Sequence, residues 1–531
     1  MITRWQQSPL VFIILFSLTV MGAGIWSSSI LTQGDESDYI RSSQEMLSSG
    51  DLLTPTFRDE PRFTKPPLLY WMVVSSYRLF GVSLFSSRLP MVLCGVLTVL
   101  FVYRLGLLLF DRKAALMSAL VTATAFGMVK FSKIVLMEVP LTLTMLMASF
   151  YFIRFYRDDH KHDLLVSFFF IGLSSLLKSP VYSAISVMVL LLFLLSVGGM
   201  GRIRGRESVL AVLLALLVAV PWYAAMIVLH GDAFIDFYYN EHYIKFLYVN
   251  HYLFRVWVGL LLYLLPWTFY FLFAVYRVVA QKLYRQWEYK FLLISIFVFL
   301  FVFLVPHQKG LYYAIPVVPY AGLLTGSALA GAFQPGKIWD GATAAVLCVI
   351  GAVLLGAIVL VDAQVLFSLA SGLLILAVAL VLLKQRGSKT VPFILYGLAL
   401  IPFYVVILPS VNFPVIPEKE AKPIVNGRLL YSYGVSPLKF ADALDRDIKE
   451  IIRPERLQQA IEKGGAVIMT RATFDGLSSG WLKQKVEIRL QWQRWRRRVP
   501  FSEAIDALMQ RSPEAIQETV YLIMAREAVR E

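Results

Sequence analysis

Long apolar runs constrain the fold of this chain more than any motif does. Stretches of about 17 to 25 mostly hydrophobic residues recur along it, and each is long enough to cross roughly 30 Å of hydrocarbon. Of the 531 residues, 58% are hydrophobic and only 16% are charged. We therefore predict an all-α polytopic membrane protein, because helices satisfy their own backbone hydrogen bonds inside lipid.

Thirteen runs have the length and composition of a transmembrane helix. They are 9–29, 86–110, 114–133, 139–156, 163–178, 180–198, 207–229, 256–280, 289–306, 311–332, 341–361, 365–384 and 390–410. An odd number of spans puts the two termini on opposite sides of the membrane. Lys and Arg crowd one set of short loops, and the other set holds only Lys178, Lys245, Arg255 and Lys309. This bias predicts a cytoplasmic N-terminus and a C-terminus on the outer side of the membrane.

Three other interpretations of the composition are weaker. The net charge of +15 does not point to nucleic acid, because the basic residues lie mostly in short loops between apolar runs, where they orient helices and meet anionic lipids. The two cysteines, Cys94 and Cys348, lie inside separate apolar runs, which argues against a structural disulfide or a thiolate metal site. A cleaved signal peptide at 9–29 is disfavoured by its long apolar part and the lack of a small-residue cleavage site.

The loop after the first span is long and polar. Residues 30–85 include two segments with helical patterns, 35–48 and 67–80, which we expect to lie flat in the membrane interface. The first begins with Asp35 as a candidate N-cap, and the second carries aromatic residues typical of the interface.

The composition changes after the last apolar run. We expect a transmembrane domain over 1–410, a proline-marked linker over 411–425 and a small α/β domain over 426–531 on the outer side of the membrane. Within the last part, the patterns predict helices at 436–450, 454–463, 501–510 and 513–526, and strands at Ala466–Met469 and Val486–Leu490. An Arg-rich run with interleaved tryptophans, 492–498, is as consistent with a solvated edge as with a phosphate-binding surface.

Under this topology, polar side chains from separate loops gather on the outer face. They are Asp35 and Glu36, Lys65, Glu138, Glu241, His242 and Lys245, and Lys309 with Tyr312 and Tyr313. Charged residues near a membrane are costly, so several on one face need a reason, and binding of a charged lipid headgroup supplies one. The lysines suit stabilisation of a leaving phosphate, and a carboxylate suits contact with the acceptor or the sugar.

Each candidate also has a structural explanation. Asp35 suits a helix N-cap, Glu138 a helix start, and His242 a hydrogen-bonded residue at the membrane rim. Lys65 and Lys309 are consistent with snorkelling side chains. The carboxylates leave a divalent cation open as a cofactor, but no ligand triad follows from the spacing, and we predict no metal site.

At these residues the chain resembles the GT-C glycosyltransferases of the bacterial aminoarabinose transferase and protein O-mannosyltransferase group. The likeness runs in order over about residues 1–330. It is carried by the motifs Gly34-Asp35-Glu36, Lys65-Pro66-Pro67-Leu68, Arg88-Leu89-Pro90, Glu138 with Pro140, Lys178-Ser179-Pro180, Pro221-Trp222-Tyr223, Glu241-His242 with Lys245, Pro266-Trp267, and Lys309 with Tyr312-Tyr313. Thr64 departs from the pattern, since many relatives have Glu before Lys-Pro-Pro.

The resemblance implies an inverting transfer of a sugar from an undecaprenyl phosphate donor on the periplasmic side. It implies that Asp35 and Glu138 are the catalytic carboxylates, with Glu138 where the family usually has Asp. Lys65, Lys245, Lys309, Tyr312 and Tyr313 are then expected to hold the donor phosphate. Glu36, Glu241 and His242 are expected to support them.

The acceptor stays open at this point. Lipid A or another envelope glycolipid is favoured by the resemblance of the thirteen-span plan to the aminoarabinose branch, and a Ser or Thr hydroxyl of a protein is the alternative. A hydroxyl acceptor requires Asp35 as a general base, whereas a phosphate acceptor does not. A polyprenyl-linked sugar transporter is less favoured because the polar groups crowd one face, and a purely structural subunit does not need Asp35, Glu36 and Lys65 together.

Overall fold

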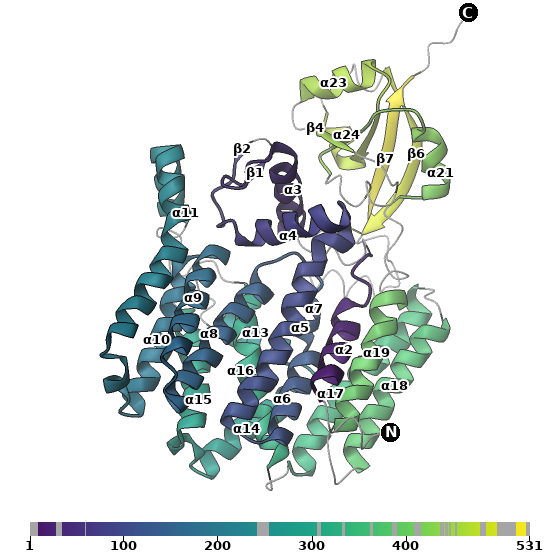
Figure 1. Cartoon of the computed structure of the whole chain (residues 1–531). Coiled ribbons are helices and arrows are strands. Elements are labelled where there is room, and N and C mark those ends of the chain that lie inside the picture. The colour runs from purple at the N-terminus through teal and green to yellow at the C-terminus, as the bar shows by residue number, and fades with distance from the viewer. Residues whose placement is uncertain are drawn as a thin grey trace, which may run out of the picture. The chain divides into compact units, whose positions relative to one another are not determined.

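The computed structural model is mainly helical, with a single larger sheet near the C-terminus (Figure 1). It describes residues 9–27, 34–58, 60–241, 254–304, 310–331, 335–361, 365–384, 390–407, 416–435, 440, 444, 448–451, 454–477, 485–495 and 517–526. The chain forms two compact units. Unit 1 comprises Met1–Ile25, Asp38–Leu354 and Ala370–Pro402, and unit 2 comprises Trp26–Ser37, Leu355–Leu369 and Phe403–Glu531.

Before the last part of the chain, helices pack both against their neighbours in sequence and against helices far away in it. The α-helices are α2 (Pro9–Gly22), α3 (Gly34–Ser49), α4 (Leu68–Phe80), α5 (Leu84–Leu109), α6 (Arg112–Thr124), α7 (Phe126–Phe131), α8 (Glu138–Asp158), α9 (Lys161–Leu177), α10 (Pro180–Ser196), α11 (Arg206–Tyr239), α13 (Arg255–Tyr263), α14 (Thr268–Ala280), α15 (Trp287–Val302), α16 (Val318–Ala330), α17 (Lys337–Val361), α18 (Val365–Lys384) and α19 (Thr390–Pro402). Short 3-10 turns, η2 (Met200–Ile203), η4 (Leu283–Arg285) and η5 (Leu311–Val317), and one π-helical turn, η6 (Phe403–Ile407), complete this set.

Every predicted span coincides with helical structure, although several are broken. The run 114–133 is divided between α6 and α7, and the run 256–280 is divided between α13 and α14, which are bent by 110°. Among the described residues, four helical segments are long and apolar enough to cross a membrane: α5, α8, α11 and Leu311–Ala330. The α13–α14 pair makes a fifth if it counts as one span. The chain is thus a helical protein with several membrane-spanning candidates, and the count of thirteen stays a prediction.

Helices α8 and α9 form an antiparallel hairpin. Asp159 ends α8 in the left-handed conformation, with φ 53°, and α9 begins two residues later. The hairpin therefore places the first residue of α8 beside the last residues of α9. Pro180 at the start of α10 closes the other side of this junction, because proline suits the first turn of a helix and cannot continue the one before.

The first loop is anchored to unit 1 through its C-terminal half. A two-stranded antiparallel ladder joins β1 (Thr56–Phe57) to β2 (Glu60–Pro61), an element that the sequence did not suggest. Trp71 Nε1 donates to the Leu52 carbonyl oxygen at 2.6 Å, and Trp222 Nε1 donates to that of Leu53 at 2.9 Å. The loop is held between α4 and α11 by these two indoles, and this fixes the approach to Lys65.

The C-terminal end of α2 is capped by a buried lysine. Lys133 Nζ donates to the carbonyl oxygens of Val20, Met21 and Ala23, each at 2.8 Å. Helix C-termini leave carbonyl groups without intrahelical partners and attract positive charge. Lys133 therefore has a structural role, which distinguishes it from the other lysines on this part of the chain.

Unit 2 contains a five-stranded mixed sheet with the order β4-β3-β5-β7-β6. The strands are β3 (Leu430–Tyr433), β4 (Lys449–Ile451), β5 (Ala466–Thr470), β6 (Val486–Trp495) and β7 (Gln517–Ala525). β3 pairs in parallel with β4 and β5, whereas β7 pairs antiparallel with β5 and β6. Alternate residues of β5 enter two separate hydrophobic clusters, so the sheet is covered on both faces. Helices α21 (Glu418–Val425), α23 (Pro454–Glu462) and α24 (Arg471–Gly476) flank it.

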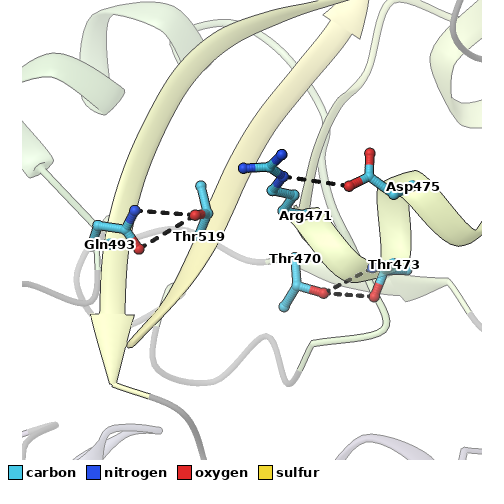
Figure 2. Close-up of polar contacts among 6 residues, drawn as sticks. All are labelled: Thr470, Arg471, Thr473, Asp475, Gln493 and Thr519. Atoms are coloured by element: carbon cyan, nitrogen blue, oxygen red, sulfur yellow. Dashed lines mark hydrogen bonds and ion pairs between the residues drawn. The ribbon is translucent and has the colours of Figure 1, made fainter. Parts of the chain in front are cut away.

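Local polar contacts fix the turn after β5 and the pairing of β6 with β7 (Figure 2). The Thr470 side chain caps α24 by accepting from the Thr473 backbone N–H at 3.1 Å. Across the sheet, Gln493 Nε2 donates to Thr519 Oγ1 at 3.1 Å. These are ordinary capping and cross-strand interactions, and they indicate a structural role for this face.

Several predicted elements differ from the structure or lie outside its described residues. The segment 513–526, predicted as a helix, contains strand β7, because Val520 to Met524 are buried on both faces and such a continuous apolar run does not distinguish helix from strand. The end of the predicted helix 436–450 belongs to β4, and 501–510 lies outside the described residues. The predicted linker 411–425 contains α21. Helix α3 begins at Gly34, so Asp35 lies in its first turn.

Candidate functional site

An ion pair closes the open end of the α8–α9 hairpin. Glu138 Oε1 accepts a hydrogen bond from Lys178 Nζ at 2.8 Å, and both side chains are buried. Glu138 is the first residue of α8 and Lys178 directly follows α9, so each charge complements the dipole at its own helix end. The pair is local to the hairpin although 40 residues separate its members.

Aromatic rings surround the Lys178 ammonium. Its Nζ lies 4.1 Å from the centroid of the Tyr313 ring, 5.2 Å from that of Tyr182 and 5.7 Å from that of Tyr312. Tyr312 and Tyr313 lie on η5, and Tyr182 lies in the first turn of α10. Cation–π contacts of this kind stabilise a desolvated cation without using up its hydrogen-bond donors. Lys178 is thus held in place by the rings as well as by Glu138.

Lys65 lies in the field of this ion pair. Its pKa is lowered to about 8, chiefly by burial and then by the positive charge of Lys178, while Glu241 and Glu138 act in the opposite direction. Pro66 and Pro67 follow it and lead into α4. A lysine with a lowered pKa between a second cation and two carboxylates is a candidate binding site for an anion.

The loop just before Lys65 is held by contacts of Arg62 and Phe63. Arg62 Nη1 lies 3.4 Å from Asp38 Oδ2, and its guanidinium stacks over the rings of Tyr39 and Phe57 at about 5 Å. Phe63 packs against Phe234 of α11, with ring centroids 5.3 Å apart. Lys65 is therefore presented from a loop that is fixed on both sides.

The structure brings together only some of the predicted site residues. Lys65, Glu138, Glu241, Tyr312 and Tyr313 belong to unit 1, and the charges of Glu138 and Glu241 both act on Lys65. Three further predicted site residues, His242, Lys245 and Lys309, lie outside the described residues.

Asp35 and Glu36 open helix α3. Asp35 is exposed and Glu36 is fully buried, and both complement the positive end of the helix dipole. Both belong to unit 2 by its bounds, Trp26–Ser37, so their meeting with Lys65 and Glu138 is a proposal.

Sequence reasoning missed Lys178 and Tyr182 as site residues. Lys178 ends an apolar run on the side with few basic residues and precedes Ser179-Pro180. A charge at that position was a usable signal, because it carries a desolvation cost that needs a partner. Glu138 as that partner follows only from the antiparallel hairpin. Within the described ranges, no three His, Cys, Asp or Glu side chains group closely enough to hold a metal ion.

Known proteins are similar to this chain in sequence and in fold. Residues 64–224 match the family model described as dolichyl-phosphate-mannose-protein mannosyltransferase, a segment that includes Lys65, Glu138 and Lys178. A crystal structure of ArnT from Cupriavidus metallidurans bound to undecaprenyl phosphate superposes with a TM-score of 0.73 over 98% of both chains, at 19% identity. The chain has the fold of this ArnT structure. The resemblance inferred from the sequence is confirmed.

Curated relatives are similar to this chain over part of their length. An undecaprenyl phosphate-alpha-4-amino-4-deoxy-L-arabinose arabinosyl transferase of Pseudomonas aeruginosa is 27% identical over 61% of this chain and 59% of its own. One from Pectobacterium carotovorum is 27% identical over 44% of this chain and 41% of its own. The chain thus spans about two fifths to three fifths of the length of these two relatives.

Proposed function

We propose that this chain is an inverting glycosyltransferase that moves a sugar from an undecaprenyl phosphate donor to lipid A or another cell-envelope glycolipid. The observation that carries the proposal is the buried Glu138–Lys178 pair beside Tyr313, together with buried Lys65, whose charge interacts with both members of the pair. The fold of ArnT and the names of the curated relatives support the choice of donor.

The chemistry requires a leaving phosphate and an attacking oxygen. The acceptor oxygen forms a bond to the anomeric carbon on the face opposite the phosphate, and the bond from that carbon to the phosphate oxygen breaks. The electron pair stays on the departing phosphate, which gains negative charge. Lys65 stabilises this charge in our proposal, together with Lys245, Lys309, Tyr312 and Tyr313.

The carboxylates act on the acceptor and the sugar. Asp35 faces the acceptor in this proposal. A phosphate oxygen of lipid A is already anionic, so Asp35 then orients the acceptor or the sugar instead of removing a proton. Glu138 acts beside it, and Glu36, Glu241 and His242 support the site. No metal ion is part of the proposed reaction.

The proposed arrangement in the cell follows from the loop charges. Thirteen spans, a cytoplasmic N-terminus and a periplasmic domain over 426–531 place the donor loops on the periplasmic side of the inner membrane. The Lys and Arg bias supports this orientation, and labelling of cysteines introduced at loop positions measures it.

Transfer to a protein hydroxyl is the second candidate, and one observation favours it. The family model that matches residues 64–224 is described by protein mannosylation. In that reaction Asp35 is the general base that takes the hydroxyl proton as the oxygen attacks.

A transfer assay tests the proposal and separates the two acceptors. Purified protein receives radiolabelled undecaprenyl phosphate sugars with either lipid A or a Ser/Thr-rich polypeptide. We expect label in the lipid A fraction. Label in the polypeptide alone supports the second candidate, and no transfer from any undecaprenyl phosphate sugar contradicts both.

A further inference from the structure

Glu138 uses only one of its two carboxylate oxygens. Oε1 accepts from Lys178, whereas Oε2 is buried and has no hydrogen-bond partner among the residues that the structure describes. The whole side chain is only 2% exposed. Buried polar atoms without a partner are rare in folded proteins, and each needs an explanation.

The ion pair neutralises the charge of Glu138 but leaves its acceptor capacity open. A carboxylate has room for about four hydrogen bonds, and Lys178 fills one of them. The ammonium in turn is fixed by the Tyr313 ring at 4.1 Å. Oε2 is thus buried in a defined position, and the Lys178 hydrogen bond goes to the other oxygen.

The free oxygen belongs to the same neighbourhood as Lys65. The charges of Glu138 and Lys178 both act on the Lys65 ammonium, which is the donor phosphate ligand in the proposed function. The sugar of the donor is bonded directly to that phosphate. A group that approaches Lys65 through its phosphate therefore brings its sugar close to Glu138.

We propose that Glu138 Oε2 accepts a hydrogen bond from a hydroxyl or ammonium group of the transferred sugar, with Lys178 as the positioning residue that holds Glu138. This inference rests on the proposed function. A carboxylate oxygen is an acceptor only and repels phosphate, so it selects the part of the donor that carries hydrogen-bond donors. A site built in this way rejects analogues that lack the donating group.

Binding of two lipids to the full chain tests the inference. One is undecaprenyl phosphate, which carries no sugar, and the other is undecaprenyl phosphate-α-4-amino-4-deoxy-L-arabinose. For the wild-type protein we expect tighter binding of the sugar-carrying lipid. In Glu138→Gln, which keeps the side-chain length and an oxygen for Lys178, we expect that preference to fall by about tenfold, as for loss of one hydrogen bond to a charged group. Undecaprenyl phosphate serves as the reference, because loss of the Glu138 charge also acts on Lys65, and the ratio of the two affinities isolates the contact to the sugar.

A matched control comes from the opposite end of the same hairpin. Asp163 is also a buried carboxylate with an ion-pair partner, Arg154, at 3.3 Å. Asp163→Asn should leave the preference for the sugar-carrying lipid unchanged. Lys178→Met should reduce the preference, because Glu138 loses its fixed position.

The outcomes separate this inference from the proposed function. If Glu138→Gln weakens both lipids equally, or neither, the proposed contact to the sugar is wrong while the donor class stands. If Asp163→Asn lowers the preference as much as Glu138→Gln does, the effect is structural and the inference is also wrong. If the wild-type protein binds neither lipid, the proposed function itself fails.

Discussion

Two buried lysines of unit 1 serve opposite purposes. Lys133 Nζ donates hydrogen bonds to three backbone carbonyl oxygens at the end of α2, each at 2.8 Å. Lys178 makes its side-chain hydrogen bond to Glu138 and is otherwise surrounded by tyrosine rings. Lys133, bound by backbone carbonyls, stabilises the fold, whereas Lys178 in our proposal positions the carboxylate of Glu138.

The largest expected effect tests the structural role of Lys133. Lys133→Met leaves three buried carbonyl groups without a donor, at about 1–3 kcal/mol each. We expect little folded protein after detergent extraction, measured by size-exclusion chromatography and thermal unfolding. Lys130→Met is the control, since among the described residues the Lys130 ammonium lies over the Phe126 and Phe131 rings, at 5.9 and 5.5 Å, and caps no helix. Equal stability of the two variants contradicts the structural role of Lys133.

The next effect is confined to chemistry. Asp35→Asn should abolish sugar transfer while the protein stays folded, because Asp35 is exposed and its loss removes a charge from the proposed acceptor site. The radiolabel assay with lipid A measures it. Glu60→Gln, an exposed carboxylate of β2 in the same loop, serves as the control and should retain transfer. Wild-type rates in Asp35→Asn remove Asp35 from the mechanism.

The third effect concerns the Glu138–Lys178 ion pair, and a second substitution should restore the stability that the first one removes. Lys178→Met leaves Glu138 as an uncompensated buried charge, which costs about 3–5 kcal/mol of stability. Adding Glu138→Gln removes that charge, so we expect the double variant to regain most of the stability in thermal unfolding but not the transfer activity. Recovery of both, or of neither, breaks the distinction between Lys178 and Lys133.

The smallest effect is a pH dependence at Lys65. Its pKa of about 8 means that the ammonium is charged below pH 8 and becomes neutral as the pH rises through 8. The donor phosphodiester keeps one negative charge over this range, so its affinity should decrease above pH 8, by up to about tenfold per pH unit. Titration calorimetry from pH 6.5 to 9.5 measures this. Lys65→Arg, which stays charged, should give a flat profile, and a decrease of the same size in that variant assigns the titration to another group.

Much of the fold was predictable because apolar length and loop charge are local signals. All thirteen predicted spans coincide with helical elements. The breaks inside them were less predictable, because they depend on packing. Pro266 marks a possible break in the run 256–280, but it does not give the 110° angle between α13 and α14. Strand β7 was missed because a strand buried on both faces lacks the alternation that identifies one.

The candidate site divides in the same way. Lys65, Glu138, Tyr312 and Tyr313 were identified from charge position and family motifs. Lys178 was visible in the sequence, but its pairing with Glu138 depends on the turn at Asp159 that folds α9 back along α8. The role of Lys133 as a helix cap follows from contacts 110 to 113 residues apart in sequence, which no local pattern reveals.

An experimental structure of the full chain with undecaprenyl phosphate bound tests the central claim most directly. We predict the phosphate within hydrogen-bond distance of Lys65, the Glu138–Lys178 pair intact beside it, and Asp35 facing the same cavity. A phosphate bound away from Lys65, or Asp35 and Glu138 on opposite sides of the bilayer, contradicts the account.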